Sequence, residues 1–214
     1  MKHIDFTPAD DKFTIITQAR KILMDRGQLE SARYLAEFLF ADKKDRGGKP
    51  YFGHLERVAQ GIDDARIKPI GYLHDLIEDI EGWTYDDLRL IGFDDFIVDG
   101  VQAVTKTNDH VPYFDEMVRV GLTPQAIPVK KSDLTDNSNL SRLGHAPAEK
   151  DIERVHKYKL AYDYLSDVEA GKTAPGTRFG DWMHEQSPEK QDWEMLRKYS
   201  AQNPPVLNPG FTLP

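Results

Sequence analysis

The chain has no cysteine among its 214 residues, which excludes disulfide bonds and thiolate metal ligands. It also has no uninterrupted apolar run of the ~18 residues that a membrane-spanning helix needs. Its first residues lack the apolar core of a signal peptide, since charged residues appear at once. We therefore expect a cytoplasmic protein with no membrane partner.

The chain is also short of positive charge. It has 28 Lys and Arg residues but 36 Asp and Glu residues, which gives a formal net charge of −8. General nucleic-acid binding depends mainly on neutralising phosphates, so no nucleic-acid partner is expected. A local basic pocket for a small anion is compatible with this balance. Contents of 39% hydrophobic and 30% charged residues are typical of a soluble globular protein, as one domain with extensions or as two small domains.

Strand-like alternation is also missing, and apolar residues recur instead at helical spacing through most of the chain. The predicted fold class is all-α, a bundle of about eight to ten helices with a proline-rich tail from Asn203. The first helix is predicted to have Thr7 as N-cap and Pro8 at N1 and to end at Gly27. Its apolar stripe is predicted to consist of Phe13, Ile16, Ala19 and Leu23. Further helices are predicted over residues 29–41, 55–62, 69–80, 85–91, 96–104, 114–120, 149–170 and 188–199.

The densest polar stretch is His74-Asp75-Leu76-Ile77-Glu78-Asp79. On one continuous helix its four polar side chains share an arc of about 140°, and the apolar residues face the core. Carboxylates this close repel one another, and a divalent cation held by imidazole and carboxylate groups relieves that repulsion. A solvated acidic face is the alternative, and the hexapeptide alone does not decide between the two.

Two further polar groups accompany this stretch. Residues 42–51 read as a loop that concentrates cations just ahead of His54, which stands at the edge of a predicted helix. A solvated loop and a packed histidine are the ordinary alternatives, but their adjacency favours a binding site. Farther along, Asp133 and Asn137 lie one helical turn apart, beside Lys130.

The ordered set His54, His74-Asp75 and Asp133 resembles the H…HD…D ligand set of the HD-domain metal phosphohydrolases. Gly48-Lys49-Pro50-Tyr51-Phe52-Gly53-His54, followed by Val58-Ala59, is similar to the G-x-P-Y-x-x-H-x-x-x-V-A motif of the (p)ppGpp hydrolase branch. Residues 73–79 resemble its L-H-D-x-[IV]-E-D motif, and residues 83–93 and 101–106 follow two more of its segments loosely. Residues 130–137 resemble K-L-A-D-x-x-x-N, although Asp136 stands where histidine or tyrosine is common.

The resemblance covers about residues 30–165 and implies an HD phosphohydrolase domain over residues 29–170. A helix within residues 1–28 is expected to pack on this domain, and residues 171–214 are expected to add a helix and an extended tail. The implied metal ligands are His54, His74, Asp75 and Asp133, holding one Mn²⁺ or another divalent ion. Glu78 is expected to activate water, while Asp79 either assists or orients one of the histidines.

The implied activity is removal of the 3′-pyrophosphate from (p)ppGpp-type alarmones, giving GDP or GTP and pyrophosphate. Cations must converge on such an anionic substrate. The expected substrate contacts are Lys43, Lys44, Arg46, Tyr51, Lys106, Lys130 and Asn137. Alternatives are a phosphatase for another nucleotide, such as ppApp, NADPH or a 3′-nucleotide, or an antitoxin to a toxic small alarmone synthetase. A homo-oligomer and a cognate synthetase partner both stay open.

Overall fold

The computed structural model describes residues 11–106, 110–143 and 146–186. These residues form α-helices and a short 3-10 helix but no β-strand; a single isolated bridge joins Lys44 to Pro50. The all-α prediction is therefore confirmed for the described part of the chain. Among its helices, none is both long and apolar enough to cross a membrane.

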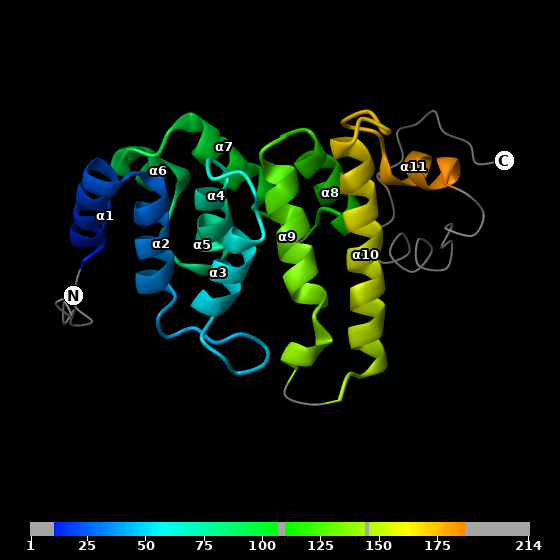
Figure 1. Cartoon of the computed structure of the whole chain (residues 1–214), viewed down its shortest axis with the longest axis horizontal. Coiled ribbons are helices and arrows are strands. Elements are labelled where there is room, and N and C mark those ends of the chain that lie inside the picture. The colour runs from blue at the N-terminus through cyan, green and yellow to red at the C-terminus, as the bar shows by residue number, and fades with distance from the viewer. Residues whose placement is uncertain (1–10, 107–109, 144–145, 187–214) are drawn as a thin grey trace.

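The helices run in the order shown in Figure 1. Their bounds are α1 Lys12–Arg26, α2 Gln28–Leu39, α3 Phe52–Gln60, α4 Lys68–Leu73, α5 Leu76–Asp79, α6 Tyr85–Ile91, α7 Asp95–Val104, α8 Tyr113–Gly121, α9 Ala126–Ser138, α10 Glu149–Glu169 and α11 Phe179–Glu185. The 3-10 helix η1 (Leu140–Arg142) follows α9. Most predicted helices are present, with ends that differ by at most three residues.

The beginning of α1 differs from the prediction. Its N-cap is Asp11, whose side chain accepts a hydrogen bond from the backbone N–H of Thr14 at 2.9 Å. The predicted cap, Thr7 with Pro8, lies outside the described residues. The predicted end is confirmed, because Gly27 follows the helix with a φ of +91°, a value that favours glycine.

Burial on α1 also differs from the prediction. Phe13 is 74% exposed, whereas Ile15, Ile16 and Ala19 are buried against the rest of the protein. The predicted stripe is therefore confirmed at Ile16 and Ala19 and wrong at Phe13, because α1 packs on α2 and α6 and leaves the Phe13 side exposed to solvent. The domain boundaries at residues 28/29 and 170/171 stay predictions.

Local signals located α6 accurately. Thr84 forms a reciprocal capping box with Asp87, and Gly92 ends the helix in the left-handed conformation with a φ of +111°. These signals depend on neighbouring residues only, so the sequence suffices to place them.

The single helix predicted over residues 69–80 is wrong. The chain forms α4, then a turn at His74 and Asp75, then the short α5. Asp75 adopts φ −98° and ψ 0°, and the His74 imidazole bonds the backbone carbonyl of Gly71. The turn lets both side chains point toward α3 and α9 instead of sharing one helix face.

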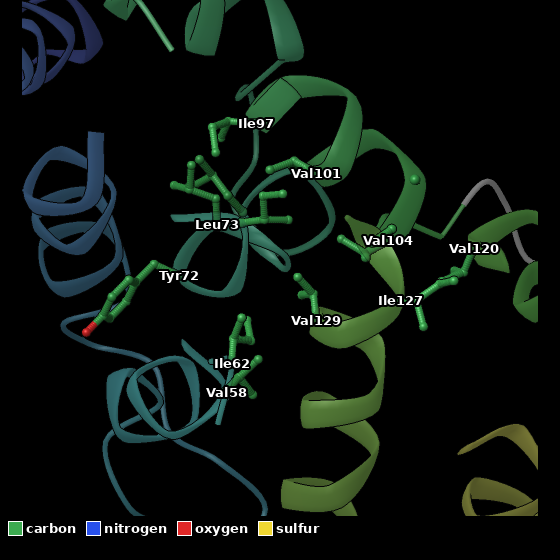
Figure 2. Close-up of a cluster of buried hydrophobic side chains, with 14 of the residues drawn as sticks. Val58, Ile62, Tyr72, Leu73, Ile97, Val101, Val104, Val120, Ile127 and Val129 are labelled. Atoms are coloured by element: carbon green, nitrogen blue, oxygen red, sulfur yellow. The ribbon is translucent and has the colours of Figure 1, made fainter. Parts of the chain in front are cut away.

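Helix α4 is the centre of the bundle. It contacts α2, α3, α7 and α9, and its residues from Pro69 to Leu73 are all buried. Figure 2 shows Leu73 close to Ile97 and Val101 of α7, with Val129 of α9 nearby. A helix enclosed on all sides by apolar side chains holds the turn that follows it in a fixed place.

The C-terminal part of the described chain packs on α8 and α10. Helices α9 and α10 lie side by side (Figure 1), and α11 contacts α8 through a stack of Phe179 on Phe114 with ring centroids 3.8 Å apart. The Trp182 indole donates to the Asp167 carboxylate at 3.1 Å. Helix α11 was not predicted, and the helix predicted over residues 188–199 and the tail lie outside the described residues.

Gly71→Ala is expected to lower the free energy of unfolding by about 1–3 kcal/mol, because overpacking forces helices apart. An added Cβ would lie 2.8 Å from Ala59 Cα and 2.9 Å from Ile62 Cδ1. The control is Gly180→Ala in α11, where no atom lies within 4 Å of the new Cβ, and it should stabilise by about 0.5–1 kcal/mol. Urea unfolding followed by circular dichroism measures both; equal midpoints would contradict the tight α3–α4 contact.

Candidate metal centre

Four side chains from α3, the α4–α5 turn and α9 converge on one point. His54 Nε2 lies 3.5 Å from Asp133 Oδ1 and 3.7 Å from Asp75 Oδ2. His74 Nε2 lies 3.7 Å and 3.1 Å from the same two oxygens. Neighbouring ligands of one ion with bonds of ~2.0–2.2 Å lie about 3.0–3.5 Å apart, and these spacings are close to that range, so the four side chains could share a divalent cation. Donor atoms of His54, His74 and Asp75 all lie within 4.8 Å of one another.

His74 turns Nε2 toward this point. Its Nδ1 lies 2.8 Å from the carbonyl oxygen of Gly71, a contact that requires a proton on Nδ1 and leaves Nε2 as the nitrogen that can bind a metal. Nε2 is buried without a hydrogen-bond partner, although Asp75 Oδ2 is only 3.1 Å away. A buried ring nitrogen that faces carboxylate oxygens is satisfied by a proton or by a metal cation between them.

The local field favours positive charge at the same point. Burial alone would lower the pKa of His74, but the Asp75 and Asp133 carboxylates raise it well above the usual value. Burial alone would raise the pKa of Asp133, yet Lys130 and His74 hold it well below the usual range. Asp133 therefore stays an ionised carboxylate, which is the form that binds a metal.

His54 is oriented by Asp136. Asp136 Oδ2 lies 2.6 Å from His54 Nδ1, and Asp136 Oδ1 accepts a hydrogen bond from Arg57 Nε at 2.6 Å. Burial would raise the pKa of Asp136, but the hydrogen bonds from His54 and Arg57 lower it to about 2. A carboxylate that holds the outer nitrogen of a ligand histidine is a common companion of metal sites.

Asp136 departs from the family motif, but its spacing from Asp133 is itself a signal of a role at this centre. Asp136 stands three residues after Asp133 and therefore faces the same side of α9. Asp79, for which orientation of a histidine is one of the two predicted roles, instead places Oδ2 3.0 Å from Lys43 Nζ. Asp136 and the carbonyl of Gly71 take that orienting role.

Three residues expected to contact substrate contact the carboxylates of this centre. The Tyr51 hydroxyl donates to Asp75 Oδ2 at 2.6 Å, and Asn137 Nδ2 donates to Asp133 Oδ1 at 2.5 Å. Lys130 Nζ lies 2.9 Å from Asp133 Oδ2. Their hydrogen bonds stabilise both carboxylates in the ionised state.

Glu78 lies beside the centre and is held by its neighbour in space. Its Oε1 accepts a hydrogen bond from the backbone N–H of Lys106, just after α7. Desolvation raises the pKa of Glu78, the Lys106 N–H partly offsets this, and the Asp75 charge raises it further. A carboxylate with a raised pKa near a metal centre suits proton transfer.

The predicted cations of residues 42–51 separate into two sets. Lys43 Nζ donates to the Asp79 carbonyl at 2.8 Å and lies over the rings of Phe40 and Tyr51. Lys44, Arg46 and Lys49 are exposed, and Arg46 lies near α10. The loop is therefore divided between the α5 end and the α10 side of the centre.

Helix α10 adds cations that sequence reasoning missed. Burial lowers the pKa of Lys157, and the surrounding charges of Arg154, Lys130, Arg46 and Lys106 lower it further. We call these five residues the basic cluster. Lys157 Nζ also lies 4.2 Å from the ring centroid of Tyr113. Alone, α10 reads as an amphipathic helix, and only its packing against α9 brings Lys157 toward Lys130.

Comparison with known proteins does not assign the chain to a family. No protein-family model matches the chain, and no curated protein matches it. The function proposed below therefore depends on the geometry of this centre and on the sequence motifs.

His74→Ala and Asp133→Ala are expected to lose metal binding, because each removes one of four converging donors. The protein should carry close to one divalent ion per chain after reconstitution and dialysis. His184→Ala on α11 is the control, since it removes an exposed imidazole away from the centre and should keep the ion. Elemental analysis measures the content; equal content in all three variants would refute the ligand assignment.

Proposed function

We propose that the protein is a divalent-metal-dependent phosphohydrolase that removes the 3′-pyrophosphate from (p)ppGpp-type alarmones. The observation that carries the proposal is the convergence of two imidazoles and two carboxylates on one point, with the buried Nε2 of His74 facing the carboxylates. The resemblance of the surrounding motifs to alarmone hydrolases supplies the substrate class.

The donor set fits Mn²⁺, because two nitrogen and two oxygen ligands suit divalent transition metals and leave positions open. The chemistry that such an ion supplies is Lewis-acid activation of a water molecule and of a phosphoryl oxygen. Tyr51, Asn137 and Lys130 keep the ligand carboxylates ionised and in place. Asp136 and the Gly71 carbonyl fix the two imidazole rings.

In this proposal Glu78 accepts a proton from the attacking water. Its tether to the Lys106 amide limits where the carboxylate points, and its raised pKa suits general-base catalysis. The water oxygen bonds to the phosphorus atom that is attached to the 3′ oxygen. The bond from that phosphorus to the 3′ oxygen breaks, and the 3′ oxygen takes up a proton. Asp79, held by Lys43, is the second acid near this path.

The basic cluster supports an anionic substrate beside the metal centre. Lys130 belongs to the cluster and also pairs with Asp133, so the cluster and the centre share one residue. Phosphate oxygens there would accept charge-assisted hydrogen bonds from several cations. This positive region lies in a protein of net charge −8, which is consistent with one specific anion site.

A substrate panel tests the proposed function. With Mn²⁺, the protein should release pyrophosphate from ppGpp and pppGpp and should act less well on ppApp, NADPH and 3′-AMP. Glu78→Gln keeps an oxygen for the Lys106 amide but cannot take a proton, so turnover should fall by ~10²–10⁴-fold while the metal stays bound. Absence of release from every guanosine substrate, or normal turnover of the glutamine variant, would overturn the proposal.

Arg46→Ala and Lys157→Ala are expected to raise the Michaelis constant for ppGpp roughly 10- to 100-fold, the value of a lost charge-assisted contact. The increase should shrink at high ionic strength, where the wild type also binds more weakly. Lys21→Ala on α1 removes the same charge from an exposed site and is the control. The Michaelis constants are measured by steady-state kinetics at two salt concentrations. Unchanged Michaelis constants of both variants at low salt would show that these cations do not contact the substrate.

A further inference from the structure

Arg142 joins the loop of residues 42–51 to α9. Its Nη2 donates to Asp45 Oδ2 at 2.8 Å, and its Nη1 donates to the Asp136 carbonyl oxygen at 3.0 Å and to the Asp136 carboxylate. The Asp45 side chain is only 5% exposed and that of Arg142 is 17% exposed. Ion pairs this enclosed hold their geometry far better than exposed pairs do.

On the loop side, Asp45 organises the turn that carries Arg46. Its Oδ1 accepts hydrogen bonds from the backbone N–H groups of Gly47 and Lys49, each at 2.9 Å. The loop backbone also lies directly against η1, because a Cβ on Gly47 would collide with the carbonyl oxygen of Arg142. The position of this turn is therefore set by Arg142.

On the metal side, the Asp136 carboxylate is shared. Oδ2 contacts both His54 Nδ1 and Arg142, while Arg57 holds Oδ1. The contacts thus form one continuous chain, Asp45–Arg142–Asp136–His54, from the turn that carries Arg46 to a metal-ligand imidazole. Arg57 supplies a second charge to Asp136 but makes no recorded contact with Asp45 among the described residues.

We propose that Arg142 is a positioning residue that couples the loop of residues 42–51 to the metal centre. The inference rests on the proposed metal site. A planar guanidinium bridges two carboxylates in fixed directions, so a shift of the turn is transmitted to the His54 ring. An anion that orders Arg46 then strengthens metal binding, and by reciprocity the metal strengthens anion binding.

The first test measures the dissociation constant of Mn²⁺, without substrate, by titration followed by the paramagnetic resonance of free Mn²⁺. Arg142→Gln should weaken binding roughly 10- to 100-fold, as loss of an outer-shell partner does. Asp45→Asn touches neither Asp136 nor His54, yet it should weaken binding roughly 3- to 10-fold, and it should add nothing in the Arg142→Gln background. Asp42→Asn, an exposed acid of the same loop, should leave the constant unchanged.

The second test runs in the opposite direction and needs no metal. Asp136→Asn should speed hydrogen exchange at the Gly47 and Lys49 amides of the metal-free protein at least several-fold, whereas Asp42→Asn should not. The coupling stands only if both tests move as expected. Equal Mn²⁺ constants for Asp45→Asn and wild type, or unchanged exchange in Asp136→Asn, would overturn it. Failure of the wild type to bind Mn²⁺ would instead reject the proposed metal site, and the exchange test would still decide the link.

Discussion

Two carboxylates and two imidazoles share a small, poorly hydrated space, and the surrounding structure responds to this constraint. Such groups repel or lose hydration unless positive charge and hydrogen bonds compensate them. Lys130, Tyr51 and Asn137 compensate from one side, and Asp136 compensates by holding a ring nitrogen. A divalent cation is the remaining compensation that this arrangement calls for. The rest of the bundle keeps these four groups close together, and three of them, His54, His74 and Asp75, could hold a metal ion.

The fold could be predicted wherever local chemistry decides it. The cap at Thr84 and the left-handed Gly92 follow from neighbouring residues, and α6 was placed accurately. The turn between α4 and α5 could not be predicted, because helical periodicity is satisfied through residues 69–80. The contacts of His74 with His54 on α3 and with Asp133 on α9 are long-range and override the local preference. The exposure of Phe13 could not be predicted for a similar reason, since packing on α2 and α6 decides which side of α1 is buried.

The candidate site was predictable in its ligands and less so in its surroundings. His54, His74, Asp75 and Asp133 were named from motif order, and the structure brings them together. Whether they hold an ion stays a prediction. The orienting role of Asp136 had a signal in its spacing from Asp133, but its partner in α3 is far away in sequence. The sequence carries no signal for the position of Lys157, because only the packing of α10 against α9 brings this residue near Lys130.

The burial of α4 has a consequence for folding. Its last turn leads directly into His74, and the other donors come from positions 54 and 133, in helices that α4 contacts. An ion held there is a reversible cross-link among three distant segments of a chain that has no cysteine. By mass action, whatever binds only the folded state stabilises it in proportion to the logarithm of its concentration. If the centre binds an ion, the melting temperature of this protein should rise with the concentration of free metal around it.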